Sequence, residues 1–105
     1  MFRRKPRLSD DEWLTLSTWV SDEVGRRRQM GYEELLQMKN KPIHVNVTLD
    51  SGDILVGESI VFWDDQREQR NLRVIVDVWD PRRRVSRSIV SEDFIRAPDG
   101  SFIGE

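Results

Sequence analysis

Residues 43–63, IHVNVTLDSGDILVGESIVFW, constrain the fold of this 105-residue chain more than any other stretch. From Ile43 to Asp50, apolar and polar side chains alternate, which is typical of a strand with one buried and one wet face. Turn residues follow, and Gly52 can adopt the positive φ that tight turns use. The alternation resumes at Ile54. The stretch therefore predicts a β-hairpin.

Glu58 complicates the second strand of this hairpin. A two-residue loop would place Leu49 opposite Ile54, and strict alternation would then place Glu58 on the apolar face. An unpaired carboxylate is costly there, so we expect a bulge or a sharp bend at Gly57. Such a bend would cover both sides of the later half of the strand, as in a small barrel.

Two helices are predicted before the hairpin. Ser9 and Glu12 form the capping-box pattern of a helix start, and apolar residues then recur at helical spacing over residues 10–29. This apolar stripe comprises Trp13, Leu16, Val20 and Val24. Residues 32–38 predict a short second helix that ends before Pro42.

Further strands are predicted after the hairpin, over residues 72–79 and 85–90, with a short piece at 94–96 and a terminal strand or tail at 101–105. We therefore expect a single α+β domain over residues 9–105. An N-terminal helix and a short second helix would pack on a strongly bent, four- or five-stranded antiparallel sheet that approaches a small barrel. Residues 1–8, rich in Arg and Lys, predict a flexible basic arm.

Composition gives no global preference for nucleic acid or membrane. The chain has 17 basic and 19 acidic residues, a net charge of −2. It lacks cysteine and has one histidine, so we expect no metal and no cofactor. No apolar run approaches the ~18 residues of a membrane span. We expect a cytoplasmic protein without a membrane partner.

Catalytic residues are difficult to assemble from this sequence. His44 lies among the polar positions of its strand, which predicts a surface residue rather than a general base. The acidic pairs at 64–65 and 92–93 would face opposite ways on strands. Nucleophile motifs and glycine-rich phosphate loops are absent from the sequence. The sequence therefore predicts a protein that is not an enzyme, with no small-molecule substrate evident.

An arginine-rich turn is the first candidate binding surface. Clustered guanidinium groups bind phosphates or carboxylates. The alternative is a solvated hairpin tip, with the charges balanced by Asp77 and Asp80. The candidate residues for nucleic acid or an acidic partner are Arg82, Arg83, Arg84 and Arg87.

A surplus of large apolar side chains is the second candidate. Ile75 and Trp79 lie opposite the main alternation of their strand, on a face that Leu55 would extend. We expect the first helix to cover most of this face, and the remainder to serve self-association or a protein partner. The candidate interface residues are Trp63, Ile75 and Trp79.

Residues 43–65 resemble the first motif of the Sm and Sm-like family. The likeness rests on the turn Gly52, a second glycine at Gly57 and the alternating apolar positions Val45, Val47, Leu49 and Leu55. The resemblance implies a five-stranded Sm-like or SH3-like barrel, ring formation through edge strands and, in many members, RNA binding.

The sequence thus leads to two functional hypotheses. The first is a small non-catalytic interaction module that binds a protein partner or assembles with itself. The alternative is an Sm-like RNA-binding protein that uses the arginine-rich turn and the basic arm.

Overall fold

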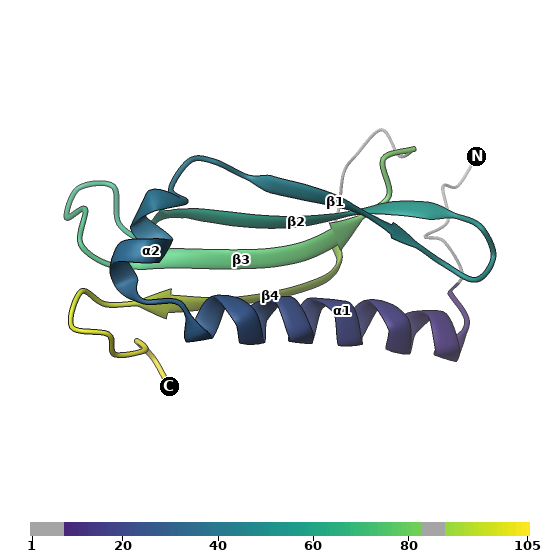
Figure 1. The fold of residues 1–105 in the computed structure, drawn as a ribbon, viewed down its shortest axis with the longest axis horizontal. Helices are drawn as coiled ribbons and strands as arrows, with labels where there is room; N and C mark the ends of the chain where they lie inside the picture. The colour runs from purple at the N-terminus through teal and green to yellow at the C-terminus, as the bar shows by residue number, and fades with distance from the viewer. Residues whose placement is uncertain (1–7, 83–87) are drawn as a thin grey trace.

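The structure, a computed structural model, describes residues 8–82 and 88–105. Its elements are α1 (Asp10–Gln29), α2 (Tyr32–Gln37), β1 (Ile43–Thr48), β2 (Ile54–Trp63), β3 (Leu72–Trp79) and β4 (Ser88–Arg96). The strands form one antiparallel sheet in the order β1-β2-β3-β4. The predicted α+β class, with two helices and a four-stranded antiparallel sheet, is confirmed, although the sheet is not closed into a barrel (Figure 1). Most of the predicted basic arm (residues 1–7) and Arg83, Arg84 and Arg87 lie outside the described residues.

The capping box at the start of α1 forms as predicted. The Glu12 N–H donates to the Ser9 hydroxyl, and the Ser9 N–H donates to the Glu12 carboxylate, both at 3.1 Å. The helix ends where the Met30 N–H donates to the Arg27 carbonyl at 3.1 Å. Its bounds match the predicted 10–29.

Helix α1 lies along one face of the sheet, against β3 and β4 (Figure 1). Of the predicted stripe, Leu16, Val20 and Val24 are buried, whereas Trp13 is 45% exposed. Trp19 instead packs on the core. The buried residues that the strands and the β1–β2 connection contribute to this core are Val47, Leu49, Leu55, Val61, Leu72, Val74, Val76, Val78 and Phe94.

The β1–β2 loop differs from prediction by one residue. The Leu49 N–H donates to the Asp53 carbonyl at 2.8 Å, so the loop has three residues and not two. Gly52, with φ of +90°, supplies the left-handed position of such a loop. A slip of one residue turns a whole strand over. Leu55 therefore faces the helices, and Glu58 faces away from them.

This register removes the reason for a bulge at Gly57. Both pairings of β2 continue through Gly57 without a shift, so the predicted bulge was wrong. The register shift in the β3–β4 pairing lies at Val78/Trp79 instead. The sheet is open because its edge strands, β1 and β4, do not pair with each other.

Strand β4 runs without interruption from Ser88 to Arg96, whereas the sequence predicts a strand over residues 85–90 and a separate short piece at 94–96. The chain end then folds back beside it. Phe102 forms a bridge with Arg96, and the Ile103 N–H donates to the Ile95 carbonyl at 3.0 Å.

Candidate functional site: the open face of the sheet

The sheet face turned away from the core is the candidate site, and we call it the open face. Because alternate residues of a strand point to opposite sides, Ile75 and Trp79 lie opposite the buried Val74, Val76 and Val78. Open-face side chains that stand in register on neighbouring strands are His44, Glu58, Asp77 and Ser91 in one row, Val56 and Trp79 in a second, and Ile60 and Ile75 in a third.

The first helix does not cover this face. The residues that pack on the helix-bound core include neither Ile75 nor Trp79. Leu55, predicted to extend their surface, is only 1% exposed and lies on the core side. The prediction of a helix over Ile75 and Trp79 was therefore wrong, because the helix selects the more apolar face of β3.

Trp63 belongs to the other side of the sheet. It pairs with the buried Leu72 and packs on the core. The Lys39 ammonium lies 5.2 Å from the centroid of its ring, within the range of a cation–π contact. Trp63 thus shares no surface with Ile75 and Trp79, and the three predicted interface residues are not brought together.

A polar row crosses the middle of the open face. His44 Nε2 lies 2.5 Å from Glu58 Oε2, a contact between β1 and β2. The Ser88 hydroxyl donates to Asp77 Oδ2 at 2.6 Å, a contact between β4 and β3. The side chains of four strands therefore form two polar pairs that lie next to each other.

Asp77 is the member of this row with a buried oxygen that lacks a hydrogen bond to any described residue. Its Oδ1 is buried and has no hydrogen-bond partner among the described residues. Burial raises the pKa of the Asp77 carboxyl, and the charge of Glu58 raises it further, against the opposing effects of Ser88 and His44. A positive charge near Oδ1 would stabilise the ionised carboxylate.

A hollow of about 260 Å³ lies beside this carboxylate. Among the described residues, Glu58, Asp77, Trp79 and Ser88 line this hollow. The His44 and Trp79 rings meet edge to face, with centroids 6.5 Å apart, so the indole has a neighbour on the β1 side. Two carboxylates and an aromatic ring are groups that together attract an organic cation.

Arg73, a basic residue on the open face of β3, is already paired with carboxylates. Arg73 lies 2.8 Å from the Asp64 carboxylate and also pairs with Asp93. Both contacts raise the pKa of the Arg73 guanidinium, with the Asp64 hydrogen bond as the largest cause. Arg73 is therefore held at the far end of the open face from Trp79.

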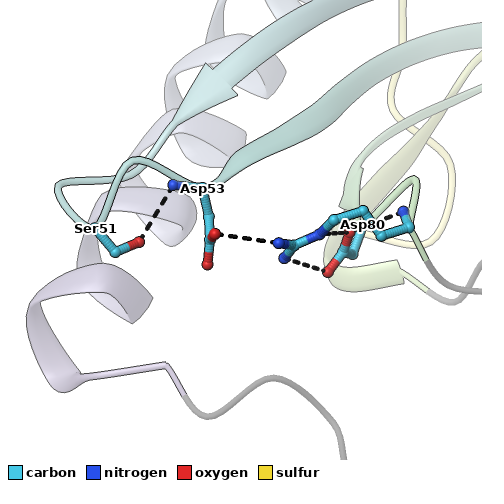
Figure 2. Close-up of polar contacts among 4 residues, drawn as sticks. Ser51, Asp53 and Asp80 are labelled. Carbon is cyan, nitrogen blue, oxygen red and sulfur yellow. Dashed lines mark hydrogen bonds and ion pairs between the residues drawn. The ribbon is translucent and has the colours of Figure 1, made fainter.

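Arg82 is the predicted phosphate-binding arginine that the structure describes, and it is paired with carboxylates. Its guanidinium donates to Asp80 Oδ2 at 2.9 Å and to Asp53 Oδ1 at 3.1 Å. Figure 2 shows these contacts, in which Asp53 belongs to the β1–β2 loop and Asp80 to the turn after β3. Asp80, chiefly through its hydrogen bond, raises the pKa of Arg82. Arg82 thus joins two loops and has little charge left for phosphate.

Glu58, Asp77 and Ser88 were not among the predicted site residues. The signal for Asp77 was its position inside an apolar strand, where a carboxylate is unexpected. The sequence predicts Glu58 on the wrong face, because the β1–β2 loop is one residue longer than the expected two-residue loop.

Within residues 8–82 and 88–105, no three His, Asp or Glu side chains lie close enough to hold a metal ion. No helix in this part of the chain has the length and apolarity to cross a membrane. Comparisons of the chain with protein-family models, curated proteins and solved structures found no match. The Sm-like resemblance therefore stays a prediction.

Proposed function

We propose that this chain is a non-catalytic interaction module that binds a partner protein on its open face. An Arg or Lys side chain of the partner enters the hollow between Glu58, Asp77 and Trp79. The observation that carries the proposal is the position of Trp79, beside two carboxylates and on a face that no described helix covers.

The chemistry of the hollow supports a basic side chain. Asp77 Oδ1 lacks a hydrogen-bond partner among the described residues, and a guanidinium or ammonium group supplies donors and positive charge at once. Trp79 provides a ring for the cation to lie against. Tryptophan is also a residue type on which binding energy concentrates at protein interfaces.

The dimensions of the open face also suit a protein. Four strands spaced ~4.8 Å apart and about eight residues long span roughly 19 × 26 Å, or about 500 Å² before side-chain relief. This is less than the ~800 Å² per partner of a standard interface and corresponds to a small, transient one. The row of Ile60 and Ile75 beside the hollow supplies apolar contact.

RNA binding through the arginine-rich turn has less support. Phosphate contacts require cations that are not already neutralised. Arg82 is paired with Asp80 and Asp53, and the other three arginines lie outside the described residues.

The hollow is tested by NMR titration of ¹⁵N-labelled protein with Nα-acetyl-arginine amide and Nα-acetyl-lysine amide. We expect amide shifts that centre on Glu58, Asp77 and Trp79, and their loss in Asp77→Asn. Nα-acetyl-glutamate amide is the control probe. Equal responses to the acidic and basic probes, or shifts elsewhere, would contradict the proposed hollow.

The partner is tested by capture from a lysate in which both RNA and protein are analysed. The bait is compared with Trp79→Ala and with Trp13→Ala, a change at an exposed tryptophan on α1. We expect a discrete protein that Trp79→Ala loses and Trp13→Ala keeps. RNA that is retained by Trp79→Ala would favour the alternative function and overturn this one.

A further inference from the structure

The two edges of the sheet are protected very differently. Strand β4 carries Glu92 and Asp93, and the chain end pairs with it through the Arg96–Phe102 bridge. Strand β1 has the sequence IHVNVT, with no Asp, Glu, Lys or Arg, and pairs with β2 alone among the described strands. Charges, bulges and covering segments are the usual means of keeping an edge strand from pairing with another chain, and residues 8–82 and 88–105 supply none of them to β1.

The backbone of β1 offers hydrogen bonds to such a partner. The bond from the Leu49 N–H to the Asp53 carbonyl fixes which residues face β2. Along an antiparallel strand, every second residue directs its backbone N–H and C=O groups toward the same neighbouring strand. Ile43, Val45 and Val47 therefore form backbone hydrogen bonds with β2. The N–H and C=O groups of the residues between them, His44 and Asn46, point toward the outer edge.

The side chains of β1 are complementary to a second copy of themselves. Ile43 and Val45 are 41% and 43% exposed, since α1 lies against β3 and β4 and not over β1. In an antiparallel pairing centred on Val45, each Val45 faces its own copy, Ile43 faces Val47, and His44 faces Asn46. Apolar side chains then meet on one side of the sheet and polar ones on the other.

The charges that flank β1 select the antiparallel direction. The exposed Lys41 precedes the strand, and the exposed Asp50 follows it. In the antiparallel pairing centred on Val45, Lys41 of one copy lies opposite Leu49 of the other and one residue from Asp50, twice in the dimer. Parallel pairing would instead place like charges together.

We infer that a second copy of this chain adds to β1 in antiparallel register and forms one continuous eight-stranded sheet. The two-fold axis is perpendicular to the sheet, so both open faces lie on the same side, and a dimer presents two hollows to one partner. The interface uses a different surface from the open face, and either proposal can fail without the other. A six-residue strand pair is smaller than a standard interface, so dimerisation depends on concentration in roughly the micromolar range or above.

The test is sedimentation velocity over a hundredfold range of protein concentration. We expect a monomer–dimer equilibrium in the wild type, which Asn46→Pro shifts at least tenfold toward monomer. Proline removes the outward N–H of Asn46 and leaves the bonds of β1 to β2 in place. Ile54→Lys, at a 51% exposed residue of β2 and outside the proposed β1 interface, is the control and should dimerise like the wild type. A wild type that is monomeric throughout, or an Asn46→Pro variant that dimerises equally, would overturn the inference.

Exchanging the charges of Lys41 and Asp50 tests whether the two β1 strands pair in the antiparallel direction, and it leaves the residues of β1 unchanged. Lys41→Asp and Asp50→Lys each place like charges at the interface and should weaken dimerisation severalfold. The double variant Lys41→Asp/Asp50→Lys should restore it, because opposite charges meet again. A double variant that is weaker than either single one would overturn the antiparallel arrangement.

Discussion

The Trp19 ring lies against Gly57 and leaves no room for a side chain there. A Cβ built on Gly57 would lie 2.7 Å from Cζ2 and 2.8 Å from Cζ3 of Trp19, and closer still to Cη2. The glycine in the middle of β2 thus allows the helix to approach the sheet.

Gly57→Ala is expected to lower the free energy of unfolding by about 1–3 kcal/mol, since the added methyl overpacks the Trp19 contact. Urea denaturation measures this change. Gly25→Ala is the control, because a Cβ on that residue of α1 meets nothing within 4 Å. It should stabilise the protein by about 0.5–1 kcal/mol. Equal effects of the two changes would contradict the packing argument.

Trp19→Leu should partly relieve the Gly57→Ala defect. The smaller side chain gives up some packing but makes room for the new methyl, so the two changes are not additive. A double-mutant cycle in urea measures the coupling, which we expect to be about 1 kcal/mol or more. A coupling near zero would show that the methyl is accommodated in another way.

Gly52→Ala is expected to cost about 1 kcal/mol for a different reason. Space around the residue is open, but its φ of +90° is a conformation that L side chains rarely adopt. Gly52→Asn should cost less, because asparagine tolerates positive φ better than alanine. Thermal unfolding of both variants checks this order, and the reverse order would count against a strained loop.

Asp77→Asn is expected to change how stability depends on pH. Burial raises the pKa of Asp77 above its ordinary value of 3.8. In the pH window between the ordinary pKa and the raised pKa, the folded state therefore binds more protons than the unfolded state. The stability of the wild type therefore falls as pH rises through the window, and the asparagine variant lacks this contribution. The stability of Asp77→Asn relative to the wild type should increase from pH 3 to pH 7. Parallel stability curves in thermal unfolding would contradict the raised pKa.

Phe102→Ala should expose the edge of β4. Phe102 packs edge to face on Phe94 with ring centroids 5.7 Å apart, and the Arg28 guanidinium lies 3.9 Å from its centroid. We expect a loss of about 1–2 kcal/mol, smaller than for a fully buried phenylalanine. Amide exchange in β4 should accelerate. Ile103→Ala, at a 42% exposed residue, is the control and should change stability by less than 0.5 kcal/mol. Equal exchange in β4 for both variants would contradict this role of Phe102.

Local patterns predicted the elements well. The capping box at Ser9 fixed the start of α1, and alternation over residues 72–79 gave β3 with its bounds, because both signals depend on neighbours in the chain. The candidate site was predicted only in part. The sequence predicts that Ile75 and Trp79 share a face, as they do in the structure, but it groups Trp63 with them and does not indicate Glu58, Asp77 or Ser88.

The sequence by itself determined which residues form strands and helices and which residues of each strand share a side. The tertiary structure decided which side meets the helices. A three-residue loop in place of a two-residue loop turned β2 over, which carried Glu58 out of the core and brought it beside Asp77. Loop length shifts register by whole residues, and each shift exchanges the two faces of a strand. Helix α1 packs on the more apolar face of β3, with Trp19 against Gly57, and Trp79 therefore lies on the open face.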